Sequence, residues 1–146
     1  MEPMETMEPP RAGYELLEHT ADVGVRACGA TLEELFEQAT LGLAEVLGAW
    51  RPGAGAGAAV PLAVEAGDLG GLLVDWLNEV VYVQEVRGAS LAAVTVERVG
   101  EGRASGSVSF APEPPSGGIY VKAVTYHELK VERRAGGWLA ELYFDV

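Results

Sequence analysis

Carboxylates are the residues of this sequence best suited to chemistry, and one pair stands out by its position. Asp145 is the penultimate residue, directly after the apolar stretch 142–144, so its side chain lies one residue from the terminal carboxylate of Val146. A strand that runs to the last residue holds such a carboxylate in place. Two carboxylates on an ordered backbone either raise a pKa or recruit a hard cation such as Ca²⁺ or Mg²⁺. The sequence therefore predicts a negatively charged site at the chain end.

Other aspartates have competing explanations. Asp22 lies at the entry of an apolar strand, where it either caps a turn or supplies an oxygen ligand. Asp68 precedes an apolar periodic segment and is explained as a helix cap. Asp75 and Glu79 are one helical turn apart and share a face, for which a solvated surface is favoured over a joint cation site.

Histidine and cysteine chemistry is limited. His19 and His127 cannot make a three-histidine zinc site, and strict alternation from Val121 predicts that His127 is a buried core residue. Cys28 is the only cysteine, so an internal disulfide is excluded and an inert, buried thiol is expected. Lys122 lies on the opposite face from His127, where an exposed ion pair is the ordinary role. No P-loop, dinucleotide fingerprint or nucleophile elbow occurs, and no complete catalytic apparatus is present.

The composition describes an acidic globular protein. The 146 residues include 22 Asp and Glu against 10 Lys and Arg, a net charge of −12, and 49% are hydrophobic. Phosphate binding needs a basic stripe, so direct nucleic-acid binding is not expected, whereas cations or a basic protein surface are natural partners. No apolar run approaches the roughly 18 residues that a membrane span needs. The acidic, proline-rich start differs from a secretory signal, which makes the cytoplasm the expected location.

The elements that must position these residues form an α+β pattern. Residues 1–13 are expected to be a disordered tail, and residues 14–146 a single domain. Thr31 and Glu34 form a capping box in which Glu34 is expected to bond the amide of Thr31. Two helices, over about 32–47 and 69–86, follow from apolar spacing. Strands are expected at 16–17, 23–28, 60–66, 91–99, 104–110, 119–133 and 138–146, giving a mostly antiparallel sheet covered by both helices.

Several motifs, in order, resemble the archease family. The segments that carry the resemblance are Glu18–Gly24, Thr31–Phe36, Asp75–Glu79, Lys122–His127 and Phe144–Val146. The match extends over about residues 14–146 and leaves out the tail and the Gly/Ala-rich loop 53–59. The resemblance implies an archease-like α+β sandwich.

The resemblance also implies a function. Archeases are small acidic activators, not enzymes, of the tRNA-splicing RNA ligase that joins 2′,3′-cyclic-phosphate (3′-phosphate) and 5′-hydroxyl RNA ends. They promote guanylylation of the ligase by GTP and its multiple turnover, and their site binds a divalent cation. By position, the implied metal ligands are Asp22, Asp145 and the carboxylate of Val146, with Lys122 contacting a phosphate or an acidic residue of the partner. Oxygen ligands suit Ca²⁺ first, with Mg²⁺ or Mn²⁺ as alternatives.

Two other functions remain open from the sequence. One is a chaperone-like acidic interaction module whose charge serves solubility and has no metal role. The other is a small metal-dependent hydrolase that uses Asp22 as base, although it would lack a paired histidine or nucleophile. The oligomeric state is not determined by the sequence.

Overall fold

The computed structural model describes residues 12–18, 23–53 and 57–146. Its elements, in chain order, are β1 (Gly13–Glu18), β2 (Val23–Gly29), α1 (Leu32–Val46), β3 (Val60–Glu65), α2 (Leu69–Arg87), β4 (Ser90–Gly100), β5 (Arg103–Ala111), β6 (Ala123–Arg134) and β7 (Gly137–Asp145). The α+β class is confirmed. Most of the tail expected at residues 1–13 lies outside the described residues, and β1 begins at Gly13.

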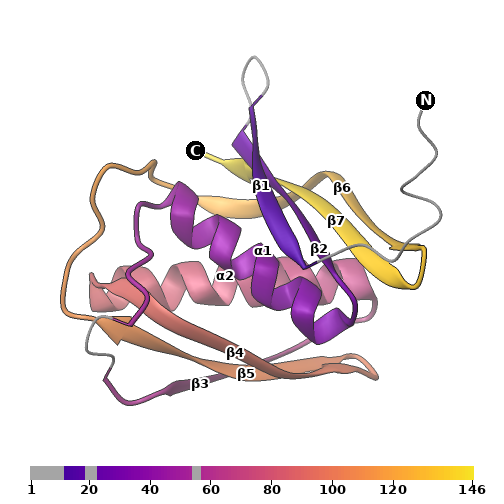
Figure 1. The fold of residues 1–146 in the computed structure, drawn as a ribbon, viewed down its shortest axis with the longest axis horizontal. Helices are drawn as coiled ribbons and strands as arrows, with labels where there is room; N and C mark the ends of the chain where they lie inside the picture. Colours follow the sequence, from indigo (N-terminus) through magenta and orange to yellow (C-terminus); the bar gives the residue numbers. More distant parts are fainter. Residues whose placement is uncertain (1–11, 19–22, 54–56) are drawn as a thin grey trace.

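The strands form two antiparallel sheets with the helices between them (Figure 1). One sheet has the order β1-β2-β7-β6 and the other β3-β5-β4. The helices therefore cover the inner face of each sheet instead of lying on one side of a single sheet. Within the described residues, no helix is long and apolar enough to cross a membrane.

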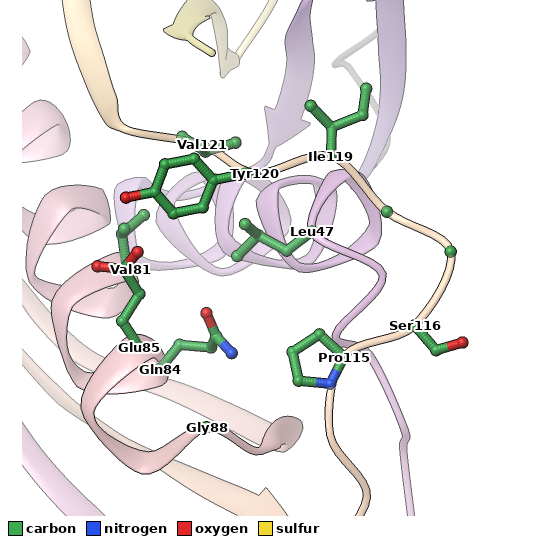
Figure 2. Close-up of a pocket in the computed structure, with 12 residues that line it drawn as sticks. Leu47, Val81, Gln84, Glu85, Gly88, Pro115, Ser116, Ile119, Tyr120 and Val121 are labelled. Atoms are coloured by element: carbon green, nitrogen blue, oxygen red, sulfur yellow. The ribbon is translucent and has the colours of Figure 1, made fainter.

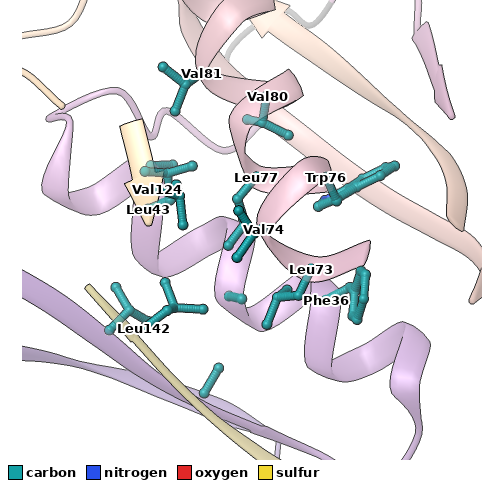
Figure 3. Packing of buried hydrophobic residues seen from close by; sticks show 14 of the residues in the cluster. Phe36, Leu43, Leu73, Val74, Trp76, Leu77, Val80, Val81, Val124 and Leu142 are labelled. Carbon is teal, nitrogen blue, oxygen red and sulfur yellow. The ribbon is translucent and has the colours of Figure 1, made fainter. Parts of the chain in front are cut away.

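Trp76, on α2, is the largest of the fully buried side chains in the described core (Figure 3). Its indole Nε1 donates to Oγ1 of Thr40 at 3.0 Å, and this hydroxyl donates to the carbonyl of Phe36 at 2.7 Å. The polar groups of Trp76 and Thr40 are thus paired, as groups inside a low-dielectric core are expected to be. The apolar side chains drawn around them come from both helices and from β6 and β7: Phe36, Leu43, Leu73, Val74, Leu77, Val80, Val81, Val124 and Leu142.

The helix starts follow the predicted caps, with one difference. Oγ1 of Thr31 accepts from the amide of Glu34 at 3.1 Å, and Oδ1 of Asp68 accepts from the amide of Gly71 at 2.7 Å. The Glu34 carboxylate, however, accepts from the amide of Ala30 at 2.6 Å, one residue before the amide that the capping box predicts. Whether Glu34 pairs with the amide of Thr31 or with that of Ala30, it satisfies one backbone N–H at the start of the helix. The predicted start at Leu32 is therefore unaffected.

The prediction for the sixth strand needs two corrections. β6 begins at Ala123, so residues 119–122 precede the strand. The register with β7 then shifts between Thr125 and Lys130, and Glu128 has a φ of 53°. This bulge breaks the alternation on which the burial of His127 was predicted, and His127 is exposed. Its amide donates to Oγ1 of Thr125 at 3.2 Å within the bulge.

Tyr14 links β1 to α1, and its replacement should change the alkaline stability. Its hydroxyl donates to the Glu45 carboxylate, and this bond, together with burial, raises the pKa of Tyr14 to about 12. An unfolded tyrosine titrates near pH 10. The unfolded chain therefore loses this proton first, so the stabilisation is complete below pH 10 and is lost as the pH rises toward 12.

We expect Tyr14→Phe to flatten this alkaline decline. After allowance for solvent screening at this partly exposed site, the difference between the two proteins should be about 1 kcal/mol. Urea unfolding at pH 8, 10 and 11 measures it, with Tyr126→Phe as the control because Tyr126 is exposed. Parallel declines for Tyr14→Phe and the parent would contradict the assignment.

Candidate functional site

The last strand is held on both sides up to its end. Phe144 pairs with Val23 of β2 on one side and with Val124 of β6 on the other. Asp145 pairs with Ala123, and its carbonyl accepts from the amide of Lys122 at 2.7 Å. A central strand with partners on both sides has few free backbone groups, which fixes the direction in which the chain ends. The ordered chain end predicted from the sequence is present in the structure.

The chain end brings together Lys122, Asp145 and Val146. Asp145 and Lys122 are exposed, and Val146 is 44% exposed. The inward side chain at this point is Phe144, which is buried in the core. The anchored backbone therefore presents the Asp145 and terminal carboxylates, and the Lys122 side chain, to solvent from neighbouring backbone positions.

Asp22, the remaining predicted ligand, lies outside the described residues, as does His19. The nearest described residue is Val23, which is bonded to Asp22 in the chain. Val23 is the partner of Phe144, the residue before Asp145. The register of β2 and β7 thus matches the start of one strand with the end of the other.

The donor atoms at the chain end suit a hard cation. The Asp145 side chain and the terminal carboxylate offer oxygen donors, which Ca²⁺ and Mg²⁺ prefer. Among the residues that the structure describes, no three His, Cys, Asp or Glu side chains group as metal ligands do. This set includes Asp75 and Glu79, which form no such cluster. A complete site at the chain end would therefore need Asp22, waters or a partner's groups in addition.

Asn78 on α2 is a positioning residue that the sequence did not reveal. Its Oδ1 accepts from the amide of Val124 at 2.8 Å, and its Nδ2 donates to the carbonyl of Val124 at 3.0 Å. β6 is the edge strand of its sheet, so the side chain of Asn78 supplies the pairing that a further strand would give. The available signal was an asparagine inside a helix, where this residue type is disfavoured.

Removing this amide should loosen the start of β6. Asn78→Ala eliminates two hydrogen bonds, each with a net worth of about 1 kcal/mol, and we expect a loss of about 2 kcal/mol in the free energy of unfolding. The amide of Lys122, two residues before Val124, should exchange with solvent at least tenfold faster. Denaturant unfolding and amide hydrogen exchange measure the two effects.

Tyr82→Ala is the matched control for Asn78→Ala, because Tyr82 lies one turn further along α2 and is 61% exposed. It should change both quantities little. Equal protection of the Lys122 amide in Asn78→Ala and the parent would show that Asn78 does not position this segment.

Cys28 shows no sign of a reactive site. It is half-buried in β2, and burial raises the pKa of its thiol, with a smaller opposing effect from Arg26. A raised pKa reduces the thiolate fraction, and the thiolate is the reactive form. The side chain therefore fits the inert thiol that the sequence predicted.

Solved structures with the same fold support this description. A Methanobacterium thermoautotrophicum protein determined in solution aligns with a TM-score of 0.71 at 27% identity, over 92% of this chain and 99% of its own. A Thermotoga maritima crystal structure, described as that of an archease and possible chaperone, aligns with a TM-score of 0.61 at 23% identity. It covers 89% of this chain and 94% of its own.

Sequence relatives carry the same family name. The archease of Methanosarcina mazei is 36% identical over 140 residues, which is 91% of this chain and 95% of the relative. The archease of Pyrococcus furiosus is 36% identical over 141 residues, at 91% and 98% coverage. The model of the archease protein family matches residues 14–146. The chain belongs to the archease family.

Proposed function

We propose that this chain is a non-catalytic activator of the tRNA-splicing RNA ligase that joins 2′,3′-cyclic-phosphate (3′-phosphate) and 5′-hydroxyl RNA ends. It promotes guanylylation and multiple turnover of the ligase in the cytoplasm. It acts through a divalent cation held by Asp22, Asp145 and the carboxylate of Val146. Ca²⁺ is the preferred ion, with Mg²⁺ or Mn²⁺ as alternatives. Family membership supports the partner, and the observation that carries the site is the pairing of Val23 with Phe144.

Chain geometry limits the distance between the proposed ligands. Paired Cα atoms in an antiparallel sheet lie at most about 5.5 Å apart, and consecutive Cα atoms about 3.8 Å apart. Because Val23 and Phe144 are paired, covalent connectivity keeps the Cα atoms of Asp22 and Asp145 within about 13 Å of each other. Two aspartate side chains can bind one cation between them when their Cα atoms are no more than about 12 Å apart, so most of this range allows both carboxylates to reach the same ion.

The residues at the chain end have distinct roles in this proposal. Asp145 and the terminal carboxylate bind the cation through oxygen, on a backbone that β2 and β6 hold from both sides. When bound, a divalent cation supplies positive charge for phosphate groups of the ligase's nucleotide. Lys122 adds a further positive charge next to Asp145, where its ammonium group contacts a phosphate or an acidic residue of the ligase. Asn78 positions Lys122 by fixing the start of β6.

The net charge of −12 suits such a partner. A ligase must hold RNA on a basic surface, and an acidic protein docks beside that surface by electrostatic attraction. Exposed charges are screened over about 8 Å at physiological ionic strength, so the association should weaken as salt is added.

A chaperone-like module without a metal role is the alternative. The description of the Thermotoga maritima relative as a possible chaperone favours it. Such a module would use its acidic surface for solubility or general association and would be indifferent to single carboxylates at the chain end. The two functions therefore differ in their response to substitution of Asp22 and Asp145.

A ligase turnover assay tests the proposal. The ligase alone should complete about one round of joining, and added parent protein should give multiple turnover with faster guanylylation. Asp22→Ala and Asp145→Ala should abolish this stimulation, whereas Asp75→Asn, which changes a carboxylate on α2, should retain it. Full stimulation by both alanine variants would place the activating site elsewhere, and no stimulation by the parent would reject the function.

A further inference from the structure

A cavity of about 340 Å³ lies where the C-terminal ends of both helices meet the segment before β6 (Figure 2). Its walls are mainly apolar: Leu47, Val81, Pro115, Ile119, Tyr120 and Val121. Three of these side chains, Leu47, Val81 and Val121, are buried and belong to the core. The cavity is therefore an apolar recess supported by rigid elements and open to solvent on one side.

Both helices end at this recess, although the last carbonyls of α1 already accept backbone bonds: those of Glu45 and Val46 pair with the amides of Gly48 and Ile119 at 3.0 and 2.8 Å. α1 ends at Val46 with Leu47 as its C-cap, and α2 ends at Arg87 with Gly88 as its C-cap, and both caps line the cavity. The end of a helix carries about half a negative charge, which favours a cation. The last turn of α1 contains no basic residue. Arg87 of α2 has its guanidinium over the ring of Phe110, 5.4 Å from the centroid, and so is committed to β5.

Two polar side chains of α2 add to the same negative character. Glu85 is exposed at the edge of the recess, and a hydrogen bond to its carboxylate raises the pKa of the Tyr120 hydroxyl. Gln84 is 5% exposed, and its Nε2 donates to the carbonyl of Ala89 at 3.1 Å. Figure 2 shows the amide oxygen of Gln84 directed toward Leu47. The recess therefore presents acceptor oxygens on an otherwise apolar wall.

The surface around the opening is unusually apolar for such an acidic protein. The recess is lined by Ile119 and Tyr120 from the segment before β6, which are 42% and 64% exposed, and α2 carries two further exposed side chains, Tyr82 and Val86. Aromatic side chains are enriched in protein interfaces, and contiguous exposed apolar patches mark interaction sites. A recess lined by exposed side chains of this kind favours a protein partner over a small metabolite.

We propose that this recess binds an arginine or lysine side chain carried by an apolar segment of a partner protein. The aliphatic stem of the basic residue packs on Leu47, Pro115 and the Tyr120 ring, as such stems do on apolar surfaces. Its charged head reaches the Glu85 carboxylate beside the C-terminal end of α2. The net charge of −12 attracts a basic segment and repels nucleic-acid phosphate.

This inference goes beyond the proposed function, because it assigns a second surface that uses neither the chain end nor a cation. The two surfaces are nevertheless adjacent along the chain. Val121 lines the recess. The next residue is Lys122, whose backbone amide donates to the carbonyl of Asp145. A partner anchored in the recess is thereby held beside the chain end.

Titration with a short peptide tests the inference on the full chain, without metal or ligase. The probe is acetyl-Leu-Arg-Leu-amide, and the control peptide replaces arginine by uncharged citrulline. In ¹H–¹⁵N spectra, the arginine peptide should shift the amides of Gly88 and residues 116–121 saturably, in the millimolar range expected for one side chain. The citrulline peptide should bind at least fivefold more weakly.

Matched variants complete the test. Glu85→Gln keeps the shape of the recess and should weaken binding of the arginine peptide at least fivefold. Glu97→Gln removes the same charge from an exposed site on β4, in the other sheet, and should leave binding unchanged. Absence of saturable shifts, equal binding of the two peptides, or equal effects of the two variants would each overturn the inference. The titration contains neither cation nor ligase. Its failure would therefore reject the recess as a binding site without rejecting the proposed activation of the ligase, which the turnover assay tests separately.

Discussion

Adding a Gly-Ser pair after Val146 is expected to weaken Ca²⁺ binding at least tenfold and to remove most of the stimulation of the ligase. The extension displaces the terminal carboxylate by about 7 Å from its position beside Asp145 and puts an uncharged peptide group in its place. A tenfold loss corresponds to about 1.4 kcal/mol, a modest value for one ligand of a hard cation. Isothermal titration with Ca²⁺ measures the affinity, and the turnover assay measures the stimulation.

The control for this extension is the same Gly-Ser pair placed before Met1. Asp145→Asn provides an independent comparison, because it removes a charged oxygen ligand and keeps the size of the side chain. Both chain-end variants should lose Ca²⁺ affinity, and the control with the pair before Met1 should keep it. An extended chain that binds Ca²⁺ and stimulates the ligase as the parent does would exclude the terminal carboxylate as a ligand.

Trp76→Ala is expected to lower the free energy of unfolding by about 3–5 kcal/mol, the range for truncating a fully buried aromatic residue. The substitution leaves a void between the helices and the sheets. It also removes the partner of the Thr40 hydroxyl, although that hydroxyl keeps its bond to the carbonyl of Phe36. A loss of this size is a large part of the stability of a domain of this length. Urea unfolding followed by circular dichroism measures it.

Trp138→Ala is the matched control for this core substitution. Trp138 is half-buried on β7 and contacts the guanidinium of Arg133, 5.3 Å from its ring centroid. We expect a loss of about 1 kcal/mol for it, from the contact and partial burial. Similar losses for the two tryptophans would contradict the assignment of Trp76 as the main aromatic anchor of the core.

These residues form one structural connection from the core to the chain end. Trp76 fixes α2 in the core, and Asn78, half a turn along the same helix, pairs with Val124 at the start of β6. The backbone amide of Lys122, just before that strand, donates to the carbonyl of Asp145. The motif 75–79 therefore positions the chain end although it contains none of the proposed ligands.

Features of the fold with local causes were predictable from the sequence. The helix starts at Thr31 and Asp68 depend on caps within three residues, and both are present. The segments of apolar periodicity gave the two helices and most strands, because packing on one face requires that spacing. The bulge after Thr125 was not predictable, since it depends on how the segment fits against β7 and α2, and the exposure of His127 follows from it.

The site was predictable in its residue types and only partly in its geometry. The ordered end of the chain followed from an apolar strand that reaches the last residues, and the structure brings Lys122 and Asp145 together there. Asn78 was missed because its function is to pair an edge strand distant in sequence, and edge positions are a property of the sheet order. The recess between the helix ends was missed for the same reason, because its walls come from separate segments.

The most direct test of the proposed cation site is a crystal structure of this chain grown with Ca²⁺, with the ion located by its anomalous scattering. We expect one Ca²⁺ at about 2.3–2.6 Å from oxygens of Asp22, Asp145 and the Val146 carboxylate, the distances typical of this ion. A terminal carboxylate that lies away from Asp22 and binds no ion, with Ca²⁺ present in the crystal, would contradict the proposal.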